Sequence, residues 1–156
     1  MDGEKKFRLV TRSDFDGLVC AVLLKSKHLI DEIKFVHPKD MQDGLIAISG
    51  DDITTNLPYV DGVHLAFDHH FSETVRTGDR ENYVIDPDAP STARVVYEHY
   101  GGAEAFPSVS EKMMMAVKRE SAMQASARLN PCTPRRESVN CRSPSIFTFT
   151  LFANRR

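Results

Sequence analysis

The sequence predicts an α/β fold with an open, mostly parallel sheet and helices on both of its faces. Short apolar segments rich in β-branched residues alternate with longer segments of helical periodicity, and glycine or proline separates many of them. Such alternation is typical of parallel strands that are linked by helices. Aspartate and histidine residues directly follow several of the predicted strands, which places them at the edge where such sheets bind ligands.

Five segments are expected to be strands, because each is short, apolar and closed by a polar or turn-forming residue. The first precedes the motif SDFDG, the second ends before proline, and the third ends in Gly-Asp-Asp. The fourth ends in Asp-His-His and the fifth in Asp-Pro. These strands are residues 7–11, 33–37, 45–49, 64–68 and 83–86.

Three helices are expected between and after these strands. The first covers about residues 16–29, and the side-chain oxygen of Ser13 or Asp14 can cap its free backbone N–H groups. The second covers about residues 91–100, with serine at its start and a Gly-Gly pair after its end. A further helix is expected to start near Ser108.

The composition is that of a globular protein in a reducing compartment. The chain has 156 residues, of which 41% are hydrophobic and 27% charged, with a formal net charge of −2. Cys20, Cys132 and Cys141 lack the spacing of a zinc site, and the N-terminus lacks the apolar core of a secretory signal. No apolar run is long enough to cross a membrane. A cytoplasmic protein without a membrane partner is therefore expected.

The chain changes character near residue 117, which predicts a division into residues 1–117 and residues 118–156. The first part holds 20 acidic and 12 basic residues, whereas the second holds 2 acidic and 8 basic residues and no glycine. The second part lacks helical periodicity, and only residues 147–152 (FTFTLF) alternate as a strand would, which is an aggregation hazard if left uncovered. We hypothesise that the second part is a frameshifted or truncated end. The alternative is a genuine short variant with a basic tail.

The acidic residues at the strand ends predict a site for divalent cations. Carboxylates gathered at one sheet edge repel one another unless a cation lies between them, and a histidine nitrogen favours manganese, iron, cobalt or zinc over magnesium. Taken singly, the first two aspartates can be helix caps and the third can belong to a turn. The Asp-His-His triplet is costly to hold beside a core without a partner. The candidate residues are Asp14, Asp16, Asp52, Asp68, His69 and His70.

These motifs resemble the DHH phosphoesterase superfamily. SDFDG before a helix, an isolated aspartate after the third predicted strand, and FDHH occur here in that order, over about residues 7–117. The neighbouring stretches HPKDMQDG and DDITTNLPYV are most similar to bacterial proteins described as exopolyphosphatase-related. The resemblance implies a DHH-type sheet domain that is followed, in the superfamily, by a smaller domain that grips the substrate. We expect that second domain to be absent from this sequence, because only about 39 residues follow the sheet domain.

The resemblance also implies a role for each candidate residue. Asp14 and Asp16 would each bind one of two metal ions, which are expected to be Mn²⁺, and Asp52 would bridge them. His69 would supply a nitrogen ligand. Asp68 would support the site either as a ligand or through another ligand, and His70 would contact the substrate. A further metal-binding aspartate is expected near residue 118, where this chain has Lys118 in the stretch AVKRESA.

Three functions follow as hypotheses. The first is a two-metal phosphoesterase that hydrolyses a phosphoanhydride or phosphodiester, such as polyphosphate, a short oligonucleotide or a related small phosphate. The second is a truncated metal-binding domain with little or no turnover, because one acid and the second domain are missing. The third is nucleic-acid binding by the basic tail, whose bases lack interleaved aromatic residues. The expected partner is a phosphate-containing small molecule or a short nucleic acid, and association into a homo-oligomer is left open.

Overall fold

Five parallel strands form the centre of the molecule. The computed structural model describes residues 5–129. All four strand pairings are parallel, and the order across the sheet is β2-β1-β3-β4-β5, so the predicted α/β class is confirmed. The strands are β1 (Phe7–Arg12), β2 (Ile30–Val36), β3 (Asp52–Thr55), β4 (Leu65–Asp68) and β5 (Tyr83–Ile85).

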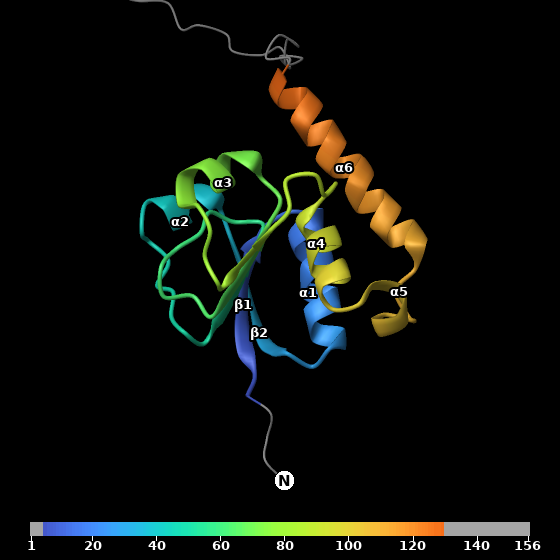
Figure 1. Cartoon of the computed structure of the whole chain (residues 1–156), viewed down its shortest axis with the longest axis horizontal. Coiled ribbons are helices and arrows are strands. Elements are labelled where there is room, and N and C mark those ends of the chain that lie inside the picture. The colour runs from blue at the N-terminus through green and yellow to red at the C-terminus, as the bar shows by residue number, and fades with distance from the viewer. Residues whose placement is uncertain (1–4, 130–156) are drawn as a thin grey trace, which may run out of the picture.

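Helices lie on both faces of the sheet. Figure 1 shows α1 and α4 side by side on one face, with α6 packed outside them, and α2 and α3 on the other side. The parallel strands need such crossover connections, because the end of one strand and the start of the next lie at opposite edges. The helices are α1 (Phe15–Ser26), α2 (Pro38–Gln42), α3 (Phe71–Thr77), α4 (Thr92–His99), α5 (Gly102–Ala105) and α6 (Glu111–Leu129).

The two predicted helix caps are present. The Asp14 carboxylate accepts a hydrogen bond from the Gly17 amide at 2.8 Å, so Asp14, and not Ser13, begins α1. The Ser91 hydroxyl accepts from the Arg94 amide at 3.2 Å and begins α4. Both caps lie on the carboxyl side of the sheet, so they also determine where the two helices start relative to the strand ends.

The third predicted strand is wrong. Residues 45–49 form a loop, and the strand is β3, which starts three residues later at Asp52. Leu45 is 70% exposed, whereas every residue of β3 is buried. The segment 45–49 is apolar in sequence, but only its two isoleucines pack partly against the core, whereas the β-branched residues of β3 lie between β1 and β4.

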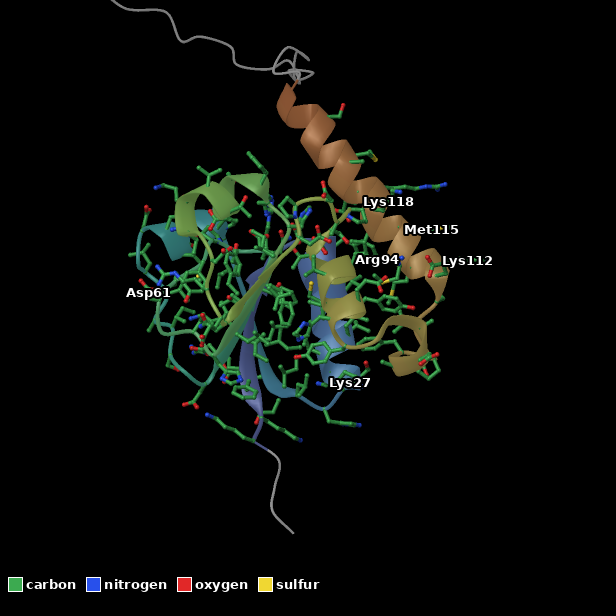
Figure 2. The ribbon with its side chains drawn as sticks, viewed as in Figure 1. Lys27, Asp61, Arg94, Lys112, Met115 and Lys118 are labelled. Atoms are coloured by element: carbon green, nitrogen blue, oxygen red, sulfur yellow. The ribbon has the colours of Figure 1, made fainter. Side chains whose placement is uncertain are left out.

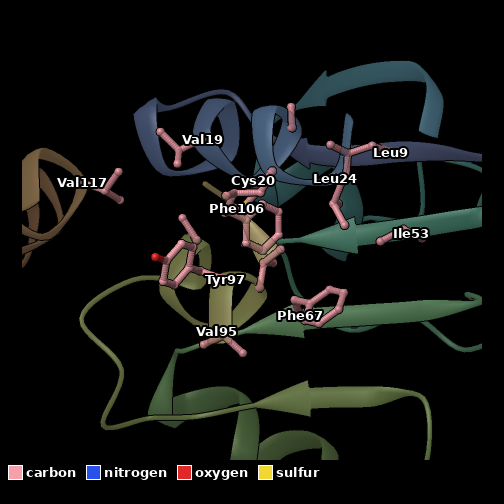
Figure 3. Packing of buried hydrophobic residues seen from close by; sticks show 14 of the residues in the cluster. Leu9, Val19, Cys20, Leu24, Ile53, Phe67, Val95, Tyr97, Phe106 and Val117 are labelled. Atoms are coloured by element: carbon pink, nitrogen blue, oxygen red, sulfur yellow. The ribbon is translucent and has the colours of Figure 1, made fainter. Parts of the chain in front are cut away.

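The main hydrophobic core lies between the sheet and the face covered by α1, α4 and α6. Figure 3 shows Leu9, Ile53 and Phe67 of three adjacent strands beneath these helices. Phe67 is 1% exposed, and Val117 of α6 is fully buried in the same cluster. This packing holds the carboxyl ends of β1 and β4 rigidly beside the start of α1.

Gly17 marks the closest approach between α1 and the end of β1. A Cβ atom at this position would lie 2.1 Å from the Arg12 carbonyl oxygen and 2.6 Å from the Thr11 hydroxyl. Alanine normally stabilises a helix by about 1 kcal/mol relative to glycine. Here we expect Gly17→Ala to lower the free energy of unfolding by at least about 2 kcal/mol, because backbone must move to relieve the clash. Urea unfolding measures the change.

The control for this substitution is Gly50→Ala, because nothing lies within 4 Å of a Cβ atom placed there. We expect the unfolding midpoint of this variant to match that of the wild type. Equal stability of the Gly17→Ala and Gly50→Ala variants would contradict the packing described for the start of α1.

The α6 helix runs without a break across residue 117. Figure 2 shows Met115 and Lys118 on this helix, and both residues are exposed. The predicted division at residue 117 stays a prediction, as does the frameshift hypothesis. Residues 147–152 and most of the basic tail lie outside the described residues. Within residues 5–129, no helix is both long enough and apolar enough to span a membrane.

Candidate active site at the carboxyl edge of the sheet

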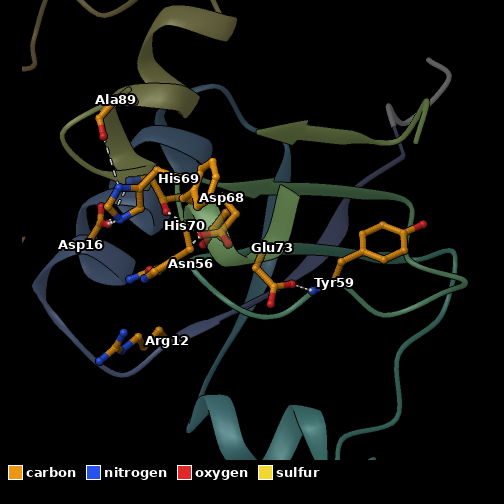
Figure 4. Close-up of polar contacts among 12 residues, drawn as sticks. Arg12, Asp16, Asn56, Tyr59, Asp68, His69, His70, Glu73 and Ala89 are labelled. Atoms are coloured by element: carbon orange, nitrogen blue, oxygen red, sulfur yellow. Dashed lines mark hydrogen bonds and ion pairs between the residues drawn. The ribbon is translucent and has the colours of Figure 1, made fainter. Parts of the chain in front are cut away.

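The carboxyl ends of β1, β3 and β4 bring polar side chains from distant parts of the sequence together. The strand order reverses between β1 and β3, so the loops after these two strands diverge and leave room for a ligand. Asp14 follows β1, Asn56 follows β3, and Asp68 ends β4. His69 and His70 come next, and Figure 4 shows them beside Asp16, Asn56 and Asp68.

Asp14 links the ends of β1 and β3. Its Oδ2 atom lies 2.9 Å from Nε of Arg12, and both of its carboxylate oxygens accept from Nδ2 of Asn56 at 3.1 Å. Because the same carboxylate also caps α1, Asp14 joins a helix start to two strand ends. Its negative charge therefore lies at the point where the strand order reverses.

Asp16 is buried on the inner side of α1 and is held by the start of α4. The backbone amides of Thr92 and Ala93 donate to its two oxygens at 2.9 and 2.8 Å. Burial nevertheless raises the pKa of Asp16 to about 6, because it outweighs these hydrogen bonds and the nearby charges of Asp14 and Asp68 add to it. The three carboxylates thus repel one another at this edge.

Asp68 and His70 form a hydrogen-bonded pair. Nδ1 of His70 lies 2.7 Å from Oδ1 of Asp68, which is fully buried. Because a carboxylate only accepts, the ring must carry its proton on Nδ1, and Nε2 becomes the nitrogen that exchanges a proton. The Tyr83 hydroxyl donates to Oδ2 of Asp68 at 3.4 Å, and burial raises the pKa of Tyr83, so this donor keeps its proton.

His69 points toward Asp16. Its Nε2 atom lies 3.9 Å from Oδ2 of Asp16, and its Nδ1 atom lies 3.3 Å from the carbonyl oxygen of Ala89. Since a carbonyl only accepts, Nδ1 carries the proton and Nε2 presents its lone pair toward the carboxylate. Burial lowers the pKa of His69, and the neighbouring His70 adds to this. The neutral ring is the form that binds a metal ion.

The structure does not bring Asp52 to this cluster, and its assignment as a bridging metal ligand is corrected here. Asp52 begins β3 at the opposite edge of the sheet, where Nε of Arg8 lies 2.6 Å from its Oδ1 atom. Burial is the largest single effect and acts to raise the pKa of Asp52, but the hydrogen bonds from Arg8 and Ser49 and the positive charge of Arg8 together outweigh it, so the pKa is lowered. The prediction is wrong because Asp52 begins β3, whereas it was expected to follow the third strand.

The sequence prediction missed Asn56 as a member of the site. Asn56 is 3% exposed and has a backbone φ of 56°, in the left-handed region that asparagine tolerates better than most residues. The signal was present: Asn56 follows the β-branched run Ile53–Thr55 and precedes Leu57-Pro58. Choosing that run as the third strand places Asn56, and not Asp52, at the carboxyl edge.

The side chains at this edge are of the chemical types that bind divalent cations. Three mutually repelling carboxylates and a neutral imidazole are suitable ligands for Mn²⁺. Within residues 5–129, no three His, Cys, Asp or Glu side chains are arranged around one common point. Binding an ion would therefore require a side chain such as Asp14 to exchange its contact with Arg12. Lys118, at the position where a further acid was expected, is exposed on α6.

The buried Asp16 makes a testable contribution to the pH dependence of stability. Its pKa rises from 3.8 to about 6 on folding, so the folded chain holds this proton more tightly than the unfolded chain. Its contribution to the free energy of unfolding is therefore greatest below pH 4 and falls by about 3 kcal/mol as the pH rises to about 6. Urea unfolding in the presence of a chelator, between pH 3.5 and 7, measures this dependence.

The matched variant for this measurement is Asp16→Asn, which has the same shape and does not titrate. Its stability is expected to lack the fall between pH 4 and 6, whatever its absolute value. If wild-type and variant curves run parallel across this range, the raised pKa of Asp16 is refuted.

The parallel sheet has an Asp-x-Asp turn after β1 and an Asp-His-His triplet that begins at the end of β4, in the order expected from the resemblance to the DHH phosphoesterase superfamily. A search of solved structures supports this class. The chain is similar to the structure described as the pGpG-specific phosphodiesterase PggH from Vibrio cholerae, with 60% sequence identity and a TM-score of 0.69. The alignment covers 76% of this chain and 38% of that protein.

The comparison corrects one expectation. The similar structure is described as a phosphodiesterase, and it does not support the exopolyphosphatase-related proteins as the nearest group. No family model matches the chain, and no curated protein matches it. The chain spans well under half the length of the structure that it resembles.

Proposed function

We propose that this chain carries the DHH-type half of a phosphodiesterase site and that the scissile phosphate lies at the carboxyl edge of the sheet. The observation that carries this proposal is the gathering of Asp14, Asp16, Asp68, His69 and His70 where the strand order reverses. The similarity to PggH supports it, because that protein is described as a phosphodiesterase.

Asp68 and His70 are assigned to substrate contact and proton transfer. The buried Asp68 holds His70 by its Nδ1–H group and so directs Nε2 toward the substrate. In its protonated form, Nε2 donates to a phosphoryl oxygen or to the leaving oxygen. Asp68 is thus a positioning residue, and its negative charge stabilises the imidazolium that forms when His70 takes up a proton.

Asp14, Asp16 and His69 are assigned to holding divalent cations, with Mn²⁺ as the expected ion. Bound cations would neutralise the phosphoryl oxygens and lower the pKa of the attacking water. The backbone amides of Thr92 and Ala93 orient Asp16, and the Ala89 carbonyl orients His69. These outer contacts keep both groups directed at the edge before any ion binds.

The similarity to PggH supports one substrate ahead of the others considered. PggH is described as specific for pGpG, a 5′-phosphorylated dinucleotide with one internal phosphodiester. We take pGpG as the first substrate of the proposed reaction, ahead of polyphosphate. Attack of water on the internal phosphorus breaks its bond to the 3′ oxygen, which takes a proton, and releases two molecules of GMP.

A second function, a metal-binding domain with little turnover, is favoured by one observation. Lys118 stands where the superfamily resemblance predicts another metal-binding acid, and no three ligands among residues 5–129 converge on a common point. A lysine near the ions would oppose their binding. This alternative predicts Mn²⁺ binding without hydrolysis.

The experiment is to incubate the full chain with pGpG and MnCl₂ and to measure GMP by liquid chromatography. Chelator and the double variant Asp68→Ala, His69→Ala are expected to remove GMP release. Asp51→Asn is the matched control, because Asp51 is an exposed aspartate just before β3, at the far edge, and within residues 5–129 its ion pair is with the exposed Lys5. Release that is equal in the double variant rejects the proposal, and Mn²⁺ binding without release favours the alternative.

A further inference from the structure

A cavity of about 350 Å³ adjoins the candidate active site on the side of α2 and α3. It extends from the Asp68–His70 pair to the ends of β1 and β2, where its wall becomes basic. The phosphodiester that is proposed to be cleaved lies beside His70 and would fill only one end of this cavity. The residues that matter for its chemistry are Arg12, His37, Lys39, Asn56, Asp68 and His70.

Arg12 is pre-positioned to bind an anion in this cavity. Its Nε atom pairs with Asp14 at 2.9 Å, which fixes the plane of the guanidinium group. Among the described residues, the ion pair with Asp14 is formed by Nε, so the two Nη groups can donate to a ligand. Only 22% of the side chain is exposed, so water screens this charge less than it screens a surface arginine. A fixed guanidinium with two remaining donors suits a phosphate group.

Lys39 and His37 extend the basic wall from the start of α2. The Lys39 ammonium pairs with Asp43 at 2.8 Å, but both side chains are exposed, so this pair contributes little and is easily exchanged for another anion. Nδ1 of His37 accepts from the Lys39 amide at 3.2 Å, so its proton lies on Nε2, which is a donor. Three cationic or donor groups thus line one end of the cavity.

The two acidic residues in the same wall are already compensated. Asp68 accepts from His70 and Tyr83. Glu73 pairs with Nε of Arg76 at 3.0 Å and accepts from the Tyr59 amide at 3.1 Å. Their charges therefore oppose an anion at the Arg12 end less than two unpaired carboxylates would.

Asn56 provides an independent sign that this cavity takes a ligand. Its Nδ2 group donates to both oxygens of Asp14, which fixes the orientation of the amide because a carboxylate cannot donate to Oδ1. The Oδ1 atom is buried and has no hydrogen-bond partner. A buried acceptor left in this state is costly. A hydroxyl group of a bound ribose would satisfy it.

We propose that the Arg12 end of the cavity is a subsite for the terminal 5′-phosphate of a 5′-phosphorylated dinucleotide. The subsite rests on the proposed function, because it takes the internal phosphodiester to lie at the His70 end. In this subsite, Arg12 and Lys39 bind the terminal phosphate, which carries more negative charge than a diester. The consequence is selection for short oligonucleotides that bear a 5′-phosphate.

Binding of pGpG and GpG to the full chain, measured by calorimetry in the presence of a chelator, tests the subsite without turnover. The two ligands differ only in the terminal phosphate. The wild type is expected to bind pGpG about tenfold or more tightly than GpG, since hydrogen bonds to charged groups have this magnitude. Equal affinity for the two ligands, or binding of neither, overturns the proposal.

Two variants test whether the preference for pGpG over GpG comes from Arg12 and Lys39. Arg12→Gln is expected to reduce it to about twofold or less, and Lys39→Gln to reduce it by about threefold, because one charge of the pair remains. Lys39→Gln leaves Asp14 untouched, so the test survives if Arg12→Gln unfolds. Lys34→Gln, an exposed lysine on β2 outside the cavity, is the matched control and is expected to keep the full preference. A preference retained in both cavity variants overturns the proposal.

Kinetics separate this inference from the proposed function. If Mn²⁺-dependent hydrolysis occurs with the same kcat/KM for pGpG and GpG, the active site stands and the subsite is rejected. If no hydrolysis occurs but the binding preference depends on Arg12, the subsite stands and the proposed function is rejected.

Discussion

Replacing Asp68 with asparagine is expected to lower kcat/KM for pGpG hydrolysis by at least about a hundredfold, in line with the loss of a group that orients a reacting histidine. The carboxylate is fully buried and lies 2.7 Å from Nδ1 of His70. Asparagine keeps the shape of the side chain but removes the charge that stabilises the imidazolium. The amide can also turn its NH₂ group toward the ring, which favours the wrong tautomer.

Steady-state kinetics with Mn²⁺ measure this loss, and a urea titration checks that the fold is intact. Tyr83 donates to Asp68 in the wild type and can still donate to the asparagine oxygen, so we expect only a small change in stability. The exposed Asp51→Asn variant provides the comparison at the opposite edge. Activity of Asp68→Asn within about threefold of the wild type would contradict the positioning role, since such roles contribute more.

Replacing Arg8 with methionine is expected to lower the free energy of unfolding by about 3 kcal/mol, because the buried Asp52 then has no cationic partner. Asp52 is 1% exposed, and two nitrogens of Arg8 lie 2.6 and 2.9 Å from its carboxylate. The Ser49 amide also donates to it at 2.7 Å, so part of its stabilisation remains. Urea unfolding at pH 7 measures the effect.

The sign of the pH dependence follows from the lowered pKa of Asp52. The stabilisation is present above the ordinary aspartate pKa of about 3.9 and is lost as the pH falls through the lower value of the folded chain. The difference between wild type and Arg8→Met is therefore expected to shrink below about pH 4, where protonation leaves no charge to compensate. Constant destabilisation down to pH 2 would contradict a charge effect.

Two further variants separate this pair from the active site. Lys5→Met breaks an exposed ion pair with Asp51 at the same edge and is expected to change the stability little. The double variant Arg8→Met, Asp52→Asn is expected to recover much of the lost stability, since a neutral amide needs no cation. Its Mn²⁺ affinity is expected to match that of the wild type. Loss of Mn²⁺ binding would restore Asp52 as a metal ligand.

Most of the fold could be predicted from the sequence because hydrophobic periodicity is a local property. β1, β4 and β5 were placed within one or two residues, and both helix caps come from short polar side chains next to an apolar face. The error at residues 45–49 has a physical cause. Apolar letters show that a segment can be buried, but the neighbouring strand decides which of two adjacent segments enters the sheet, and DITT pairs with both β1 and β4.

The candidate site, like the fold, could be predicted from the sequence only in part. The placement of Asp14, Asp16 and the Asp-His-His triplet at one edge followed from the residues after β1 and β4, since parallel strands carry their carboxyl ends to the same side. Asp52 was expected at the carboxyl edge, whereas the structure places Asn56 there, for which the sequence analysis made no prediction. The strand was expected at residues 45–49 and lies at Asp52–Thr55, so Asp52 is at its start and Asn56 follows its end.

The sequence by itself determined the α/β class, the caps of α1 and α4, and the residue types that make phosphodiester chemistry reasonable. Only the tertiary structure decided that Arg8 neutralises Asp52, that Asn56 joins Asp14, and that Arg12 faces a cavity beside His70. The reason is that these contacts join residues that lie far apart along the chain, or depend on strand register, and neither can be read from local periodicity.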